Sequence, residues 1–161
     1  MRRVVLVTGM SGTGKSAALR ELAARGHRVV DLDYGYCLLV PDPEAPVGWQ
    51  QLWDEQKVAS LLDAHDDGAL FLAGTVSNQA IFYDRFDAVV LLTAPVEVLL
   101  ARIAERSDNP FGKDELGRAT VLQHVETVEP LLQRGATHVV DAARPLAEVV
   151  ADLEAMVGWE R

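Results

Sequence analysis

The chain has 161 residues and a mass of 17.6 kDa, and its apolar fraction of 49% is enough for one hydrophobic core and too high for a disordered chain. Its formal net charge of -9 lacks the basic footprint of a nucleic-acid surface, so we expect neither DNA nor RNA as a main partner. The single cysteine, Cys37, excludes an internal disulfide and favours a reducing compartment. Beside the apolar residues 38–40 we expect a buried thiol, and the alternative is a catalytic role.

No secretory signal and no membrane span are expected. The apolar run at residues 4–7 is too short for either, and the longest apolar region, 88–101, is interrupted by Thr93, Pro95 and Glu97. These features favour a cytoplasmic protein, and the sequence leaves its oligomeric state open.

Five short apolar runs alternate with segments of helical spacing. The runs cover residues 4–7, 28–32, 69–73, 88–92 and 137–140. The helical segments cover residues 18–23, 52–62, 96–103, 121–132 and 146–153. Because the runs are continuously apolar, they predict strands covered on both faces, as in a parallel sheet. The order predicts a doubly wound α/β fold in a single domain, residues 1–161, with an irregular surface loop at 41–48, where three prolines occur.

The first run leads into a segment that fits the pattern G-x-x-x-x-G-K-[ST]. Its glycines let successive N–H groups point at phosphate oxygens, and the helix that follows adds the positive end of its dipole. The residues expected to bind the phosphates are Gly9, Ser11, Gly12, Thr13, Gly14, Lys15 and Ser16. In this pattern Lys15 reaches the β- and γ-phosphates and acts in catalysis, while the Ser16 hydroxyl binds Mg²⁺. Since the guanine-specific N-K-x-D motif is absent, we expect ATP rather than GTP.

The loop, its spacing and the chain length resemble the small-molecule kinases of the nucleoside-monophosphate kinase and shikimate kinase group, over nearly the whole chain. The resemblance implies a P-loop NTPase-type three-layer fold with a five-stranded parallel sheet and a short lid at about residues 107–113. Asp31-Leu32-Asp33 is similar to the D-x-D of shikimate kinases, which implies that Asp31 supports magnesium and that Asp33 is a catalytic residue facing the acceptor. Alternate residues at a strand end lie about 6–7 Å apart, so the two carboxylates are able to serve metal and acceptor separately. The alternative is that they only close the strand.

Residues 95–106 resemble the helix that enters the lid in these kinases. Arg102 and Arg106 are four residues apart and share one helical face. The resemblance implies that both guanidiniums act on the transferred phosphoryl group and that Arg102 also binds the nucleotide. The alternative pairs them with Glu97, Glu105 or solvent.

Two further segments resemble parts of the nucleotide and acceptor sites. Residues 142–145 resemble the segment that packs against the adenine ring, which implies that Arg144 and Pro145 contact the nucleotide, although a loop before a helix needs no such function. Residues 73–75 end the third run without a Walker B aspartate, so more of the metal binding is assigned to Asp31. Residues 77–79 either hydrogen-bond the acceptor or cap the next helix.

The acceptor region contains few cations. Residues 34–84 include no Arg and only one Lys, Lys57, and Arg85 is a distant substitute, whereas shikimate kinases and nucleoside-monophosphate kinases hold anionic acceptors with arginines. We therefore expect a small neutral or weakly charged molecule with a hydroxyl group. The region also concentrates aromatic residues, which form either a wall for a ring or a packing face: Tyr34, Tyr36, Trp49 and Trp53.

The sequence thus predicts an ATP- and Mg²⁺-dependent phosphotransferase that acts on a small-molecule acceptor. Two alternatives remain open: a nucleoside-monophosphate kinase, and an ATP-binding regulatory module with slow hydrolysis.

Overall fold

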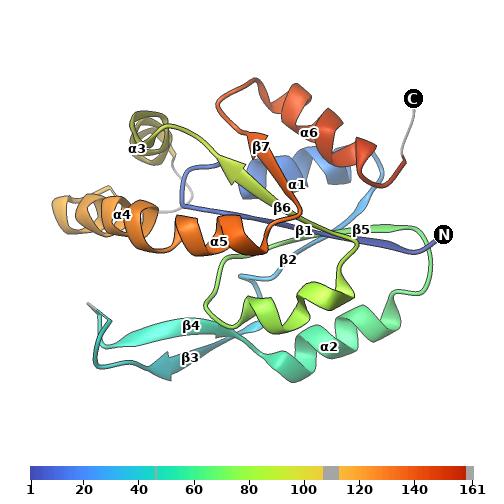
Figure 1. Ribbon diagram of the computed structural model, residues 1–161, viewed down its shortest axis with the longest axis horizontal. Helices are drawn as coiled ribbons and strands as arrows, with labels where there is room; N and C mark the ends of the chain where they lie inside the picture. The colour runs from blue at the N-terminus through green and yellow to red at the C-terminus, as the bar shows by residue number, and fades with distance from the viewer. Residues whose placement is uncertain (46, 107–112, 159–161) are drawn as a thin grey trace.

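The computed structural model describes residues 1–45, 47–106 and 113–158, and a five-stranded parallel sheet runs through its centre (Figure 1). The strand order is β2-β5-β1-β6-β7. The strands are Arg3–Gly9 (β1), Arg28–Asp31 (β2), Ala69–Ala73 (β5), Ala88–Thr93 (β6) and His138–Asp141 (β7). Each begins or ends within two residues of a predicted apolar run, so the predicted α/β fold with five parallel strands is confirmed.

Helices cover both faces of this sheet. The helices that pack against one face are α1 (Lys15–Ala24) and α6 (Leu146–Ala155). The other face is covered by α2 (Glu55–Ala64) and a short 3₁₀ helix, η1 (Gln79–Arg85). The central strand β1 reflects this: Val5 and Val7 pack toward α1 and α6, whereas neighbouring side chains pack toward α2 and η1. The strand reads as one apolar run because both of its faces are buried.

Three more helices lie near the carboxyl end of β6. They are α3 (Val96–Glu105), α4 (Glu115–Thr127) and α5 (Glu129–Gly135). Leu91 of β6 packs with Leu99 and Leu132, which anchors α3 and α5 to the sheet. The single helix predicted over 121–132 is wrong, because α4 ends at Thr127 and a second helix, α5, begins at Glu129 with Pro130 in its first turn.

An antiparallel hairpin, separate from the central sheet, was not predicted. Its strands are Cys37–Pro41 (β3) and Trp49–Trp53 (β4), and it projects beyond the sheet in Figure 1. The loop expected at 41–48 is therefore mostly the hairpin connection, with its first residue inside β3. The placement of Leu52 in a helix is wrong, since it lies in β4 and α2 starts only at Glu55.

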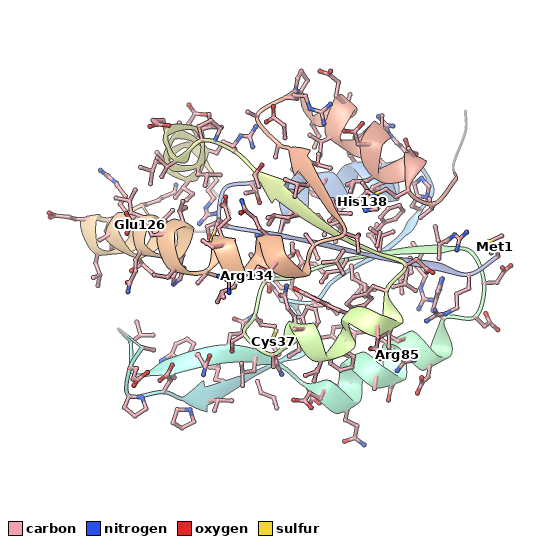
Figure 2. The ribbon with its side chains drawn as sticks, viewed as in Figure 1. Met1, Cys37, Arg85, Glu126, Arg134 and His138 are labelled. Atoms are coloured by element: carbon pink, nitrogen blue, oxygen red, sulfur yellow. The ribbon has the colours of Figure 1, made fainter. Side chains whose placement is uncertain are left out.

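Two smaller expectations are also settled by position. Cys37, expected to be buried, is half-buried where the hairpin begins, and Figure 2 labels it there. Arg85, labelled on η1, forms an ion pair of 2.6 Å with Asp63 of α2 and so links these two elements.

The lid expected at 107–113 falls on residues outside those described, apart from Lys113. Within the described ranges, no helix has the length and apolarity needed to cross a bilayer.

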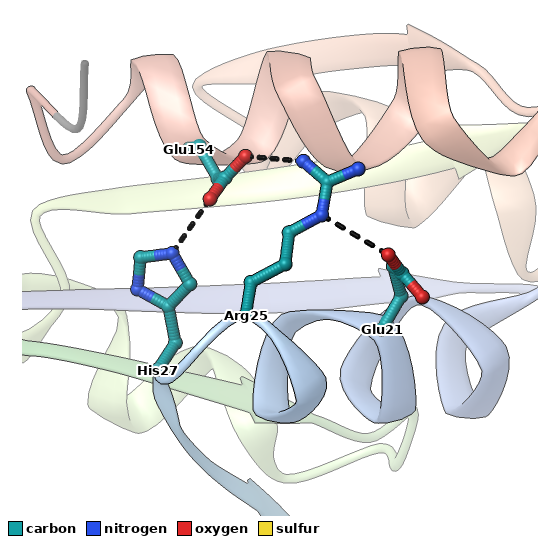
Figure 3. Close-up of polar contacts among 4 residues, drawn as sticks. All are labelled: Glu21, Arg25, His27 and Glu154. Atoms are coloured by element: carbon teal, nitrogen blue, oxygen red, sulfur yellow. Dashed lines mark hydrogen bonds and ion pairs between the residues drawn. The ribbon is translucent and has the colours of Figure 1, made fainter. Parts of the chain in front are cut away.

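A buried charged cluster joins the ends of α1 and α6 (Figure 3). Glu154 of α6 accepts hydrogen bonds from Arg25, at 2.6 Å, and from His27, at 2.8 Å. Arg25 also pairs with Glu21, one helical turn earlier, at 3.1 Å. Burial alone would raise the pKa of Glu154, but the hydrogen bonds from His27 and Arg25 outweigh it and the pKa is lowered. The cluster therefore holds a charged carboxylate in a place from which water is almost excluded.

Candidate active site

The loop between β1 and α1 has the backbone shape that the phosphate-binding pattern requires. Gly12 and Gly14 have φ values of 87° and 93°, in the left-handed region that favours glycine. A Cβ atom on Gly12 would lie 2.7 Å from the carbonyl oxygen of Leu99, so the loop also packs closely against α3. The loop ends at Lys15, the first residue of α1, which directs the helix N-terminus at the same place.

The Lys15 side chain folds back over this loop. Its Nζ donates hydrogen bonds to the carbonyl oxygens of Gly9, at 2.6 Å, and Met10, at 3.2 Å. Burial lowers the pKa of Lys15 to about 8, although the carboxylates of Asp33 and Asp31 act in the opposite direction. The ammonium group thus lies beside the loop. Phosphate oxygens bound there would form stronger hydrogen bonds with it than the carbonyl oxygens do.

Ser16 and Asp31 lie together at the start of α1 and the end of β2. The Ser16 hydroxyl donates to Asp31 Oδ2 at 3.1 Å. Hydroxyl and carboxylate oxygens are the ligands that Mg²⁺ prefers, and this ion commonly takes only one or two protein oxygens besides water and phosphate. The donor pair therefore fits a magnesium ion bound with a nucleotide.

Asp33 lies next to this pair. Its backbone N–H donates to Asp31 Oδ1 at 3.1 Å, which fixes the turn between the two carboxylates. Burial, and then the neighbouring Asp31 charge, raise the pKa of Asp33, while Lys15 lowers it. A carboxylate with a raised pKa is better suited to accept a proton from a hydroxyl group.

A cavity of about 400 Å³ brings most of the predicted site residues together. Residues 11–16 of the loop form its floor. The other predicted residues that line it are Asp33, Arg102, Arg106 and Arg144. Three predicted residues do not line this cavity: Gly9, at the start of the loop, Asp31, which lines an adjoining cavity with Ser16, and Pro145, which precedes α6.

Arg102 connects two sides of this cavity. Its guanidinium donates to the carbonyl oxygens of Gly12 and Thr13, both at 3.4 Å, and to that of Ala142 at 2.6 Å. The residue therefore links the phosphate-binding loop to the segment after β7. Arg106 follows the last turn of α3 and lines the same cavity.

The segment before α6 forms the opposite wall. Arg144 donates from Nε to the carbonyl oxygen of Asp141 at 3.0 Å and pairs with Asp152 of α6. Its guanidinium is therefore held along α6, while the residue lines the cavity beside Leu146 and Val149. This wall is partly apolar, as a purine base requires.

Thr75 supports the start of the phosphate-binding loop, a role that the sequence did not indicate. Its hydroxyl donates to the carbonyl oxygen of Gly9 at 2.8 Å and accepts from the Gly9 N–H at 3.2 Å. Gln79 supports it indirectly, because its amide donates to Thr8 Oγ1, which lies 3.0 Å from the Thr75 hydroxyl. The only signal in the sequence was the position of Thr75 just after a strand, and its role depends on β5 lying next to β1.

Ser77 and Asn78 act on the hairpin. Ser77 donates to Gln50 Oε1 at 3.0 Å, and the Asn78 side chain bonds both the N–H and the carbonyl oxygen of Trp53, at 3.0 and 3.1 Å. Asn78 precedes η1 but makes no capping hydrogen bond to it. In the free protein these residues therefore hold β4 in place.

The four aromatic residues of the acceptor region have different environments. Trp53 is only 1% exposed and packs against Gly74, so it belongs to the core. Tyr34 is 75% exposed and lines the cavity, and Trp49 is 46% exposed on β4. Tyr36 is partly buried against the core. Only Tyr34 and Trp49 are therefore open to a ligand.

Comparison with known proteins shows to which family the chain belongs. A family model described as an AAA domain matches residues 5–123. The chain belongs to this family. This AAA domain is 26% identical over 164 residues to shikimate kinase 2 of Yersinia enterocolitica, across 95% of the chain and 94% of the relative. It is also 32% identical over 152 residues to a nucleotide-binding protein of Delftia acidovorans, across 87% of the chain and 47% of the relative. The AAA domain thus spans about half the length of such nucleotide-binding proteins.

Solved structures of sugar and shikimate kinases share the fold of the AAA domain. Shikimate kinase from Acinetobacter baumannii in complex with shikimate has a TM-score of 0.65 and 20% identity, over 97% of this chain and 93% of that one. A gluconokinase from Sinorhizobium meliloti 1021 has a TM-score of 0.57 and 21% identity, over 98% and 94% of the two chains. At these identities the likeness concerns the fold. The predicted resemblance to the P-loop small-molecule kinases is confirmed.

Proposed function

We propose that this protein is an ATP- and Mg²⁺-dependent kinase that transfers the γ-phosphate to a hydroxyl group of a small neutral or weakly charged molecule. The observation that carries the proposal is the arrangement of three groups within one site. Lys15 lies over the phosphate-binding loop, Ser16 pairs with Asp31, and Asp33 lines the same cavity as the loop. A P-loop protein that only binds nucleotide has no need of the second carboxylate.

The proposed roles follow from these positions. Loop N–H groups, Lys15, Arg102 and Arg106 stabilise the negative charge on the phosphoryl oxygens. Ser16 and Asp31 hold Mg²⁺, which when bound neutralises part of the phosphate charge. Asp33 accepts the acceptor's hydroxyl proton while the acceptor oxygen bonds to the γ-phosphorus and the bond to the β-γ bridging oxygen breaks, which releases ADP.

The charge of the acceptor side supports a neutral acceptor. The single lysine of residues 34–84, Lys57, donates to the carbonyl oxygen of Gly35 at 3.3 Å. The hairpin itself contributes Asp42 and Glu44 and no cation. An acceptor with a carboxylate or phosphate, such as a nucleoside monophosphate, would have few partners in this region.

The test is ADP release from Mg-ATP in the presence of nucleosides, sugars, polyols and amino alcohols. We expect one class to stimulate turnover and Asp33→Asn to lower kcat by about 10²–10⁴-fold. Asp66→Asn is the matched control, because it removes the same charge from an exposed residue at the other end of the sheet. Unchanged acceptor-dependent turnover in Asp33→Asn would refute the role of Asp33.

A second candidate is an ATP-binding regulatory module with slow hydrolysis. It is favoured by the relatives named nucleotide-binding proteins, of which this chain matches about half. Tight Mg-ATP binding that no acceptor converts into faster ADP release would support this module over the kinase.

A further inference from the structure

The hairpin places one polar side chain directly against Asp33. Gln51 lies in the middle of β4, opposite Leu39 of β3. Its Nε2 donates to Asp33 Oδ1 at 3.4 Å and to the sulfur of Cys37 at 3.1 Å. Gln51 is therefore the contact between the hairpin and the carboxylate that the proposed function assigns to the acceptor.

The amide of Gln51 has one favourable orientation in this position. The Cys37 thiol donates its own proton to the carbonyl oxygen of Leu32 at 3.1 Å, so its sulfur faces Gln51 as an acceptor. Asp33 in its carboxylate form also only accepts. Both neighbours thus require the NH₂ group, and the amide oxygen of Gln51 must point away from Asp33.

Gln51 complements the contacts that already fix Asp33. The backbone of Asp33 is held by the hydrogen bond to Asp31, and Leu32 before it is fully buried. What these contacts leave free is the rotation of the carboxylate. Gln51 restricts it by holding Oδ1, which leaves Oδ2 for another partner. Such contacts are often long in a free enzyme and shorten when the substrate is bound.

We infer that Gln51 is a positioning residue that holds Asp33 Oδ1 so that Oδ2 faces the acceptor hydroxyl. This inference rests on the proposed kinase function. Through Gln51 Nε2 the hairpin becomes part of the acceptor site, although Gln51 lies outside the D-x-D pattern.

A variant of the neighbouring Gln50 distinguishes the positioning of Asp33 from general support of the hairpin. Gln50 is adjacent in β4, so its side chain lies on the opposite face, where it accepts the hydrogen bond from Ser77. Asn78 independently holds the backbone of Trp53. The hairpin is therefore attached without Gln51, and Gln50→Leu is a matched control for Gln51→Leu.

The test measures steady-state turnover of Mg-ATP in the presence of the stimulating acceptor. If no acceptor stimulates turnover, the test measures slow ATP hydrolysis, in which water takes the acceptor's place. We expect Gln51→Leu to lower kcat on the order of tenfold to a hundredfold, because a misplaced reacting group has effects of this size. The KM for ATP should change less than about twofold, since the phosphate-binding contacts remain. Gln50→Leu should leave kcat unchanged.

A double-mutant cycle completes the test. Asp33→Asn and Asp33→Asn/Gln51→Leu should have the same kcat, because Gln51 acts through Asp33. Full kcat in Gln51→Leu, alongside a loss in Asp33→Asn, would overturn the inference and leave the proposed function standing. An equal loss in Gln50→Leu would also overturn it, as the effect would then come from the hairpin as a whole. If Asp33→Asn keeps full kcat, the assignment of Asp33 fails, and the inference fails with it.

Discussion

At the scale of single residues, the ammonium group of Lys15, which a nucleotide would use, already has hydrogen-bond partners in the free protein. The Lys15 ammonium is bound to carbonyl oxygens of Gly9 and Met10. These carbonyls are dipoles, whereas a polyphosphate offers full negative charges, so binding exchanges weaker partners for stronger ones. The cost of burying the ammonium is what lowers its pKa.

The pKa of Lys15 leads to a testable pH dependence of nucleotide affinity. With a pKa of about 8 in the free protein, the side chain is charged below that pH and neutral above it. Phosphate binding favours the charged form, so ADP affinity should fall by about twofold between pH 7 and 8, where half of the Lys15 side chains lose their proton, and then by up to about tenfold per pH unit. Isothermal titration calorimetry measures this, and Lys15→Met should bind more weakly with no such decline. A wild-type affinity that stays constant well above pH 8 would contradict the prediction.

Sequence reasoning reached the residues that belong to a contiguous pattern. The loop 9–16 and the pair Asp31 and Asp33 were readable because a strand end and a helix start fix their neighbours. Thr75 and Gln51 were not, because Thr75 follows β5 and Gln51 lies in β4, both far in the sequence from the residues that they contact. Their contacts depend on β5 lying beside β1 and on the existence of the hairpin, and neither fact is visible in local spacing.

At the scale of elements, the hairpin shows why the sequence predicts a helix at Leu52, where the structure has a strand. Trp49, Leu52 and Trp53 lie at positions i, i+3 and i+4, which imitates a helical face. In the structure β4 is a strand with one strongly buried residue, Trp53, at its end. A short hairpin that packs mainly at its base lacks the alternation by which a half-buried strand is recognised.

The helix pair α4 and α5 illustrates a different limit. The apolar spacing of Val121, Val125 and Leu132 continues across the break, because Val125 of α4 and Leu132 of α5 pack in the same apolar cluster. The stop comes from Pro130, which has no N–H to donate and fits only the first turn of a helix. Proline chemistry therefore gave the better indication of the boundary than periodicity did.

The contact between the phosphate-binding loop and α3 gives a prediction about stability. Gly12→Ala places a Cβ atom 2.7 Å from the carbonyl oxygen of Leu99, at a φ of 87°. Gly26→Ala is the matched control, since Gly26 has a φ of 95° and no atom within 4 Å of the added group. We expect both to lose about 1 kcal/mol of unfolding free energy for the backbone strain, and Gly12→Ala to lose about 1–3 kcal/mol more for the overlap. Chemical denaturation measures the difference, and equal losses would show that the loop accommodates the methyl group freely.

At the scale of the whole molecule, the cluster around Glu154 joins distant parts of the chain. Glu154 lies near the end of the described chain, and its partners Arg25 and His27 lie just after α1. His27 also packs edge-on against Phe71 of the central sheet, at 5.2 Å between ring centroids. One carboxylate therefore connects α1, α6 and the sheet.

This cluster predicts an acid-sensitive part of the stability. Because the pKa of Glu154 is lowered from 4.5, its charged form stabilises the fold above that pH, and this contribution is lost as the pH falls below 4.5 through the lowered value. Glu154→Gln should reduce the free energy of unfolding at neutral pH by about 1.5–3 kcal/mol, the value of hydrogen bonds to a charged group. Its difference from wild type should shrink in acid. Glu148→Gln, on the exposed side of the same helix, serves as the control, and an equal loss there would contradict the prediction.

The joining of α1 to α6 has a consequence for comparing ligand states of the protein. Arg102 also ties the phosphate-binding loop to Ala142, so the two walls that would enclose the nucleotide are fastened to each other at both ends. We expect this half to serve as a fixed reference frame when crystals grown with and without ATP are superposed. Displacements should then concentrate in the hairpin, which beyond the buried Trp53 at its base is attached by a few side-chain amides and hydroxyls.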